Sequence, residues 1–256
     1  MSDFTVVIPA RMSSTRLPGK MLLDVVGLPL IVRVAKQAQL SNAKRIVIAT
    51  DHQQIYEVCR NHNLDVVMTQ EDHQSGTDRI AEVVQLLGLA DDEIIVNVQG
   101  DEPLINPELI NQLAEFIAKK QTSIATVAHP INSQDEIFNP NVVKTVLNKD
   151  NLALYFSRAP IPYYRDGYTN AKEFTAPQNI NILRHIGIYA YQVSFLNIYH
   201  QLPACPLEQV EALEQLRALY NGYKIAVMTS HNVPAAGVDT LEDLLRVRQI
   251  ISAGEK

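Results

Sequence analysis

The sequence is poor in cysteine and has no long hydrophobic run. Its two cysteines, Cys59 and Cys205, are too few for a disulfide framework in a chain of 256 residues, and their separation is not that of paired metal ligands. No apolar stretch approaches the roughly 18 residues that span a bilayer, and the first residues lack a signal-peptide pattern. We therefore expect a cytoplasmic protein without disulfides, with Cys59 buried in a helix and Cys205 in a loop.

The chain also lacks the excess of positive charge that nucleic-acid binding requires. Against 28 Asp and Glu residues it has 22 Lys and Arg, a formal net charge of -6, which argues against a nucleic-acid partner. One segment departs from this balance. Between Phe4 and Leu23 there is no acidic residue, whereas Arg11, Arg16 and Lys20 carry positive charge. A local group of cations in an acidic protein predicts a small anionic ligand.

No internal repeat, low-complexity tract or linker interrupts the chain, and this length is typical of one α/β domain. In the first half, Val- and Ile-rich runs alternate with segments whose apolar residues follow helical spacing. Such alternation predicts a largely parallel sheet covered by helices on both faces. The predicted strands are Phe4–Pro9, Arg45–Thr50, Leu64–Thr69 and Glu93–Gln99, and the predicted helical faces are Ile31–Ala38, Ile80–Leu87 and Ile110–Ile117, the last after an Asn106 cap and Pro107.

The second half begins with a different pattern, from about residue 130 to 200. Strand-like runs follow one another there with little helical pattern, and helix and strand patterns then return. We interpret 130–200 as an antiparallel insertion in a single domain spanning 1–256, and because inserted strands often form interfaces, we expect a homodimer. The predicted segments are strands at Val142–Leu147, Leu152–Ser157 and Arg184–Tyr191, a long loop at Tyr163–Asn181, a helix at Leu207–Tyr220, a strand at Lys224–Thr229 and a helix at Thr240–Ile251.

The segment Ile8–Lys20, IPARMSSTRLPGK, joins the first predicted strand to a helix. It therefore lies at the carboxyl end of the sheet, where open α/β sheets bind ligands. Ser13, Ser14, Thr15 and Gly19 allow a tight loop whose backbone N–H groups face phosphate oxygens, and the three cations of the segment could neutralise a triphosphate. Its spacing does not match the GxxxxGK[ST] phosphate loop. A solvated basic loop is the alternative, but the position after the first strand favours ligand binding.

PARMSSTRLPGK closely resembles the signature loop of the sugar cytidylyltransferases. Seven further segments resemble that family in the same order along nearly the whole chain: ATD, SGTDR, VQGDEP, SRAPIP, HIGIYAY, LEQLR and GVDT. Within the family, the chain is most similar to the enzymes that activate the eight-carbon acid sugar Kdo (3-deoxy-D-manno-octulosonate) for lipopolysaccharide biosynthesis. The resemblance implies a three-layer α/β sandwich with a mostly parallel mixed sheet, the GT-A-like fold of nucleotide-diphosphosugar transferases.

SGTDR has two interpretations. Ser75 is a candidate N-cap with Asp78 three residues later, as in a capping box. The resemblance implies instead that this turn borders the cytosine of CTP, with backbone groups distinguishing its amino group from a uracil carbonyl. The CTP site implied by the resemblance comprises Ala10, Arg11, Arg16, Lys20, Ser75, Gly76, Thr77, Asp78 and Gly100.

VQGDEP follows a continuous apolar strand, so Asp101 lies at the same sheet edge as the basic loop. A triphosphate normally travels with magnesium, and hard cations prefer carboxylate oxygens. A second carboxylate could come from Asp239 in GVDT, although Asp101 also fits a polar turn closed by Pro103, and Asp239 a turn before a helix capped by Thr240. The resemblance implies that Asp101 and Asp239 hold Mg²⁺.

Other residues suit an anionic sugar. Arg158 follows a strand-like run, and His185 opens another, where a structural histidine is the alternative. Glu214 falls on the inward stripe of a predicted helix four residues after Val210, where an ionised carboxylate needs a partner; an ion pair with Arg217 would also explain it. The resemblance places around Kdo the residues Gln99, Arg158, His185, Glu214 and Gln215.

The implied reaction joins CMP from CTP to Kdo and releases diphosphate. The anomeric hydroxyl attacks the α-phosphorus, and catalysis rests on positioning and charge stabilisation. The candidate catalytic residues are Arg11, Lys20, Asp101 and Asp239, and no side chain is assigned as a base. The alternatives are a cytidylyltransferase for sialic acid or 8-amino Kdo, and a non-catalytic sensor of nucleotide or sugar, which would not need the aspartate pair.

Overall fold

The structure, a computed structural model, describes residues 3–14, 16–73, 75–131, 133–170, 173–174, 180–231 and 237–254. Its strands are β1 (Phe4–Ala10), β2 (Asp24–Val25), β3 (Leu28–Pro29), β4 (Arg45–Thr50), β5 (Asp65–Met68), β6 (Ile94–Asn97), β7 (Ile124–Pro130), β8 (Lys144–Leu147), β9 (Ala153–Ser157), β10 (Tyr168–Asn170), β11 (Glu173–Phe174), β12 (Leu183–Gln192) and β13 (Ile225–Thr229). Its helices are α1 (Leu30–Ala38), α2 (Gln53–Asn61), α3 (Gly76–Leu86), α4 (Pro107–Lys120), α5 (Gln134–Phe138), α6 (Val193–Tyr199), α7 (Pro206–Glu211), α8 (Gln215–Tyr220) and α9 (Leu241–Gly254), with one 3-10 turn, η1 (Lys20–Leu22).

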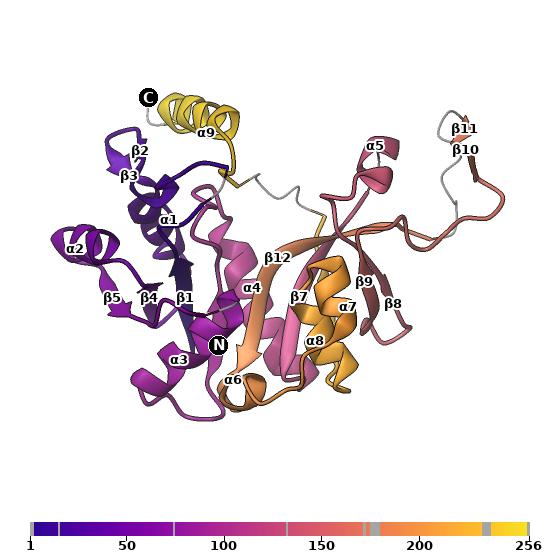
Figure 1. Ribbon diagram of the computed structural model, residues 1–256, viewed down its shortest axis with the longest axis horizontal. Coiled ribbons are helices and arrows are strands. Elements are labelled where there is room, and N and C mark those ends of the chain that lie inside the picture. Colours follow the sequence, from indigo (N-terminus) through magenta and orange to yellow (C-terminus); the bar gives the residue numbers. More distant parts are fainter. Residues whose placement is uncertain are drawn as a thin grey trace.

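A nine-stranded mixed sheet runs through the centre of the molecule (Figure 1). Its main path is β13-β7-β12-β6-β1-β4-β5, and the hairpin β8–β9 is attached beside β12. β12 is antiparallel to both of its neighbours, β6 and β7, while the other pairs along this path are parallel. The carboxyl ends of β1 and β6 therefore meet at one edge of the sheet.

Helices cover both faces of the sheet and make three layers. Along β1, Val6 and Ile8 contribute to one hydrophobic core together with residues of α1, α2, α4 and α9. Val7 between them points to the opposite face, where a second core includes residues of α3, α6 and α8. The alternation of side chains along a strand explains how one Val- and Ile-rich run supplies both cores.

Most of the predicted elements are confirmed. The predicted strands and helices of the first half match β1, β4, β5, β6, α1, α3 and α4 to within a few residues. The Asn106 side chain accepts a hydrogen bond of 2.9 Å from the backbone of Glu108 and caps α4, as expected. The insertion is antiparallel as predicted, but its last strand, β12, lies inside the main sheet.

Two predictions for the second half are corrected. The stretch predicted as a loop at Tyr163–Asn181 contains the short antiparallel pair β10–β11, which projects from the body of the molecule (Figure 1); residues 171–172 and 175–179 of it lie outside the described ones. The helix predicted at Leu207–Tyr220 is two helices, because Ala212 has a left-handed backbone (φ 50°) that ends α7. Val210 is consequently 84% exposed rather than part of an inward stripe.

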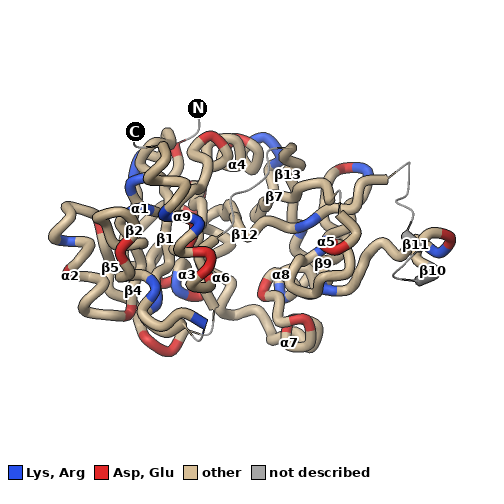
Figure 2. The backbone as a smooth tube through the Cα atoms, turned by 90° about the horizontal axis from the view of Figure 1, so that it is seen from above, with Lys and Arg blue, Asp and Glu red and all other residues tan. Residues whose placement is uncertain are grey.

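Both cysteines are free and buried. Cys59 lies in α2 as predicted, and burial raises the pKa of its thiol to about 12. Cys205 immediately precedes α7. Across the described residues, no helix combines the length and the apolar character needed to cross a membrane. Figure 2 shows lysines and arginines distributed among the acidic residues over both halves of the molecule.

Candidate active site

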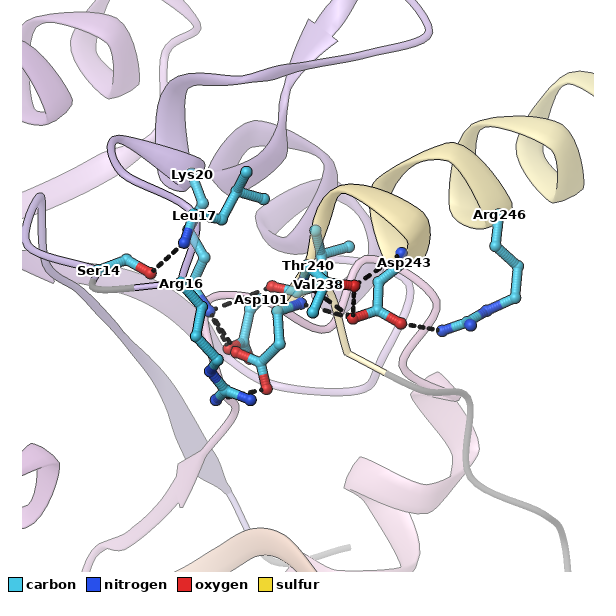
Figure 3. Close-up of polar contacts among 10 residues, drawn as sticks. Ser14, Arg16, Leu17, Lys20, Asp101, Val238, Thr240, Asp243 and Arg246 are labelled. Carbon is cyan, nitrogen blue, oxygen red and sulfur yellow. Dashed lines mark hydrogen bonds and ion pairs between the residues drawn. The ribbon is translucent and has the colours of Figure 1, made fainter. Parts of the chain in front are cut away.

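Lys20 contacts both Asp101 and Asp239, the two aspartates that the sequence nominates, and Figure 3 shows it beside Asp101. Gly19 has a positive φ of 65°, which starts η1 and turns Lys20 inward. The Lys20 Nζ donates to Asp101 Oδ2 at 2.6 Å, to Asp239 Oδ1 at 3.0 Å and to the Val238 carbonyl at 3.1 Å. Three turns that are far apart in the sequence thus converge on one ammonium group.

The turns that carry the aspartates are fixed to each other and to α9. The Val238 N–H donates to the Asp101 carbonyl at 2.8 Å. Asp243, in the first turn of α9, accepts hydrogen bonds from the backbone N–H groups of Asp239 (3.2 Å) and Thr240 (2.9 Å). Thr240 in turn caps α9 through its hydroxyl, as one interpretation of the sequence expected. The carboxylate of Asp239 is therefore positioned by a network of backbone contacts.

Charge is concentrated around Lys20. Burial lowers the pKa of Lys20, but the nearby carboxylates of Asp101 and then Asp239 outweigh it and hold that pKa above its ordinary value. Arg16, whose side chain is 66% exposed, forms a second ion pair with Asp239 Oδ2 at 2.9 Å. Sequence reasoning missed Glu102, where burial and the charge of Asp101 raise the pKa to about 8. The feature of the sequence that could have identified Glu102 is its position directly after Asp101 in VQGDEP.

The aspartates fit a divalent cation. Oxygens of Asp101 and Asp239 both lie within about 3 Å of a single nitrogen, so they converge on one position large enough for a cation. Mg²⁺ prefers such oxygens and is commonly held by one or two carboxylates together with phosphates and water. The described residues contain no group of three or more His, Cys, Asp or Glu side chains arranged for a metal, so a metal here would need ligands from elsewhere.

Gly100 brings the end of β6 against β1. A Cβ atom at this position would lie 2.6 Å from the Pro9 carbonyl oxygen and 3.3 Å from the Met21 sulfur. A real Cβ does not approach a backbone oxygen so closely, so the glycine permits the turn after β6 to lie directly against the backbone of β1. Gly100 thereby sets the position of Asp101 relative to the basic loop.

We expect Gly100→Ala to lower the free energy of unfolding by about 1–3 kcal/mol, the usual cost of overpacking, and to lower turnover with it. Urea unfolding measures the first and product formation the second. Gly187→Ala is the matched control, because no atom lies within 4 Å of its added Cβ. A Gly100→Ala protein as stable as the control variant would contradict the steric explanation.

Arg11 joins the basic loop to the SGTDR turn. Its Nη2 donates to the carbonyls of His73 (2.8 Å) and Ser75 (3.0 Å). Next to it, the fully buried Arg79 pairs with Asp51 at 2.5 Å and fastens α3 to the end of β4. This pair was not identified from the sequence, although both residues belong to the segments ATD and SGTDR. Of the loop residues, Ala10 is buried at the end of β1, and Thr15 lies outside the described part of the chain.

The SGTDR turn caps α3 and faces α8 across a cleft. Ser75 Oγ accepts from the Asp78 N–H at 3.1 Å and donates to the Asp78 carboxylate at 2.7 Å, so the capping interpretation is confirmed. Thr77 Oγ1 donates to Glu214 Oε2 at 3.2 Å. A cleft of about 630 Å³ is lined by Ser75, Gly76, Ala204, Glu208, Gln209, Ala212, Leu213, Glu214 and Arg217.

Glu214 immediately precedes α8 and lies against the start of α3. The sequence left an ion pair between Glu214 and Arg217 as an alternative, but Arg217 pairs with Glu208 at 2.7 Å. Burial raises the pKa of Glu214, opposed by hydrogen bonds from Ser75 and Thr77. Gln215 beside it is buried, and its Nε2 has no acceptor among the described residues. The two residues therefore present polar groups next to the cleft.

Arg158 is bound to the end of α7. Its Nε donates to the Glu211 carbonyl (2.6 Å), Nη2 to the Ala212 carbonyl (3.4 Å) and Nη1 to the Pro140 carbonyl (2.9 Å). The Glu211 carboxylate accepts in return from the Arg158 backbone N–H at 2.9 Å. These contacts use three of the five N–H donors of a guanidinium group, and they fix the carboxyl end of α7.

His185 lies in β12, and Gln99, which follows β6, contacts the same strand. The His185 ring contacts Thr126 Oγ1 at 2.9 Å and packs against Phe156, and burial lowers its pKa to about 3. Gln99 Nε2 donates to the Gly187 carbonyl at 3.0 Å. The structure thus brings Lys20, Asp101 and Asp239 into direct contact. Ring contacts of His185 with Phe156 and Tyr189, of Tyr189 with Tyr191, and hydrogen bonds of Thr77 with Tyr191 and Glu214 connect two of the residues proposed for the sugar, His185 and Glu214, indirectly.

Known proteins resemble the chain over nearly its full length. Residues 5–225 match the protein family described as Cytidylyltransferase. A 3-deoxy-manno-octulosonate cytidylyltransferase of Herminiimonas arsenicoxydans is 57% identical over 96% of this chain and 98% of its own. One from Neisseria meningitidis serogroup C (strain 053442) is 53% identical over 98% of both.

A solved structure gives the same result for the fold. It is that of a CMP:2-keto-3-deoxy-manno-octonic acid synthetase complexed with CTP, with a TM-score of 0.88, 39% identity, and coverage of 99% of this chain and 100% of that one. Sequence and structure therefore agree that this chain belongs to the cytidylyltransferase family.

Proposed function

We propose that this protein transfers CMP from CTP to Kdo, giving CMP-Kdo and diphosphate for lipopolysaccharide biosynthesis. The observation that carries the proposal is the convergence of Lys20, Asp101 and Asp239 at the carboxyl edge of the sheet, in a chain 57% identical to an enzyme of that name. The relationship to a nucleotide-diphosphosugar transferase fold of GT-A type is part of the same proposal.

In the proposed reaction, the anomeric hydroxyl oxygen of the sugar forms a bond to the α-phosphorus, and the bond from that phosphorus to diphosphate breaks. Lys20 and Arg16 lie where their positive charges can offset the negative charge of the phosphates. Arg11 keeps the basic loop beside the SGTDR turn, which is proposed to bind the cytosine. Mg²⁺ held by Asp101 and Asp239 would neutralise phosphate charge and lower the pKa of the attacking hydroxyl. We assign no side chain as a dedicated base.

The cleft between α3 and α7–α8 is proposed to bind the base and part of the sugar, while the phosphates lie at Lys20, Asp101 and Asp239. Ser75, Gly76, Thr77 and Asp78 are proposed for the base, with Ala10 and Gly100 shaping the floor beside them. Glu214 and Gln215 supply hydrogen bonds for the sugar, with Gln99 and His185 from the central strands and Arg158 for the carboxylate. Since free donors remain on Arg158 in addition to its three carbonyl contacts, it can serve both the fold and the sugar.

We expect Arg158→Lys to raise the KM for Kdo at least ~10-fold and to leave CTP affinity nearly unchanged, because lysine cannot reproduce a two-pronged contact. Glu214→Ala should behave similarly. Diphosphate release at varied Kdo measures the first quantity and calorimetry the second. Arg184→Lys, which keeps its charge near Glu136 in the same insertion, is the control. Equal losses of CTP binding and sugar use would show that Arg158 and Glu214 are structural.

The substrate itself is tested by diphosphate release from CTP and Mg²⁺ with Kdo, 8-amino Kdo or sialic acid. The proposal expects Kdo to be used best. A preference for sialic acid would keep the reaction class and change the substrate, and no release with any sugar would favour a sensor.

We also propose a homodimer that uses the insertion. Phe138, Leu154, Tyr163 and Ile180 are large apolar side chains exposed in this part of the chain (38–63%). Among the described strands β9 pairs with β8 alone, apart from one bridge between Leu152, which precedes it, and Ala226 of β13. Proteins usually cover strand edges and exposed apolar surfaces of this kind.

A further inference from the structure

Each of the carboxylates proposed to hold the metal already has a cation beside it. Lys20 Nζ bridges Asp101 Oδ2 and Asp239 Oδ1. The remaining oxygen of Asp239, Oδ2, is paired with Arg16. The Lys20 side chain is only 9% exposed, so the ammonium group lies inside the cluster rather than over it (Figure 3). The protein's own lysine therefore occupies the position between the two carboxylates.

This arrangement leaves little attraction for a divalent cation on its own. Lys20, Arg16, Asp101 and Asp239 carry two positive and two negative charges, so the group is neutral as a whole. A metal ion would have to displace the ammonium from both carboxylates, and among the described residues it would gain no third carboxylate, histidine or cysteine in a metal-binding arrangement. Mg²⁺ gives up its water reluctantly and is seldom held by so few protein ligands alone.

A triphosphate changes this balance, because it supplies the missing partners for both sides. Its phosphate oxygens can accept hydrogen bonds from Lys20 and Arg16, which then leave the carboxylates. The same oxygens can act as the additional ligands that a metal ion needs. Lysine suits such an exchange, since its ammonium is a point charge on a flexible stem with three equivalent donors. Within the described part of the chain, the one neutral contact that the Lys20 ammonium would give up is that to the Val238 carbonyl.

We propose that Lys20 is an internal substitute for the metal ion, so that CTP and the divalent cation load as a pair rather than one after the other. In the free chain the ammonium holds the two aspartates together. On loading, the ammonium moves from the carboxylates to the phosphates, and the divalent cation takes its place between Asp101 and Asp239. The inference rests on the proposed function and specifies how the same site selects its metal–nucleotide complex.

The test measures Mn²⁺ affinity of the full chain by calorimetry without CTP and without sugar. Wild type should bind Mn²⁺ weakly. Lys20→Met should bind it at least ~10-fold more tightly, since the competing charge is removed from a partly buried site. Arg16→Met is the matched control: it removes an equal charge bonded to the same aspartate, but from an exposed position outside the bridge, and should gain less than ~3-fold. Asp101→Asn in the Lys20→Met background should abolish the gain.

Lys20→Gln, which keeps a hydrogen-bonding side chain without the charge, is measured in parallel and should show the same gain in Mn²⁺ affinity. It keeps the inference testable if the methionine variant does not fold. Mn²⁺ affinity equal to wild type in a folded Lys20 variant would overturn the inference, as would equal gains in the Lys20 and Arg16 variants. Because no turnover is involved, this result is independent of the diphosphate-release assay, and either proposal can fail while the other stands.

Discussion

Lys20→Met is expected to lower turnover at least ~100-fold, which is the usual loss when one preorganised donor is removed from a charged transition state. Lys20 reaches the site from η1, directly after the basic loop that carries Arg11 and Arg16. Its Nζ lies within 3.1 Å of three oxygens there. The same variant should bind Mn²⁺ more tightly. Loss of turnover together with a gain of metal affinity separates a catalytic role from damage to the site.

Turnover is measured by diphosphate release at saturating CTP and Kdo, and folding by near-UV circular dichroism. Lys119→Met is the control, because Lys119 is 76% exposed and forms only an i,i+4 pair with Glu115. A folded Lys20→Met enzyme with nearly normal turnover would place the phosphate site elsewhere on the sheet edge.

Asp101→Asn and Asp239→Asn are each expected to reduce turnover at least ~100-fold and to raise the magnesium requirement, because asparagine keeps the shape of aspartate without its charge. The double variant should lose less than the product of the two single losses, since residues that hold one ion act as a unit. Turnover is measured across a magnesium titration for all four proteins.

Asp150→Asn is the control for these variants, because Asp150 is an exposed acid paired with its neighbour Lys149. Losses that multiply fully in the double variant would mean that Asp101 and Asp239 do not share a metal ion.

The layers of the fold were predictable from sequence because each layer has a local signal. Alternation of strand and helix patterns gave the parallel half, and Asn106 with Pro107 marked the start of α4. The order of strands has no such signal: α4, β7 and most of the insertion separate β12 from β6 in the sequence, and only packing places the two strands side by side. The end of α7 was missed because Ala212 adopts a left-handed backbone, for which the sequence provides neither glycine nor asparagine.

The residues of the site that directly follow strands at one edge of the sheet could be predicted from the sequence. Lys20 and Asp101 follow the neighbouring strands β1 and β6, so topology brings their turns together, and GVDT was identified by resemblance. The ion pairs within the cluster and the buried Arg79–Asp51 pair depend on side-chain positions that spacing does not encode. The same holds for Arg158, whose contacts with the end of α7 exist only because that helix ends at Glu211.

The place of β12 also determines the order in which the sheet can be completed during protein synthesis. Among the described strands, β7 pairs with β12 and β13, both of which come later in the chain, and one edge of β6 pairs with β12 as well. At about 5–20 residues per second, a ribosome needs roughly 3–12 s to progress from the end of β7 to the end of β12. For that interval the nascent chain carries the hydrophobic strand β7 without the two strands that flank it in the finished sheet, and it leaves open the edge of β6 that β12 will cover.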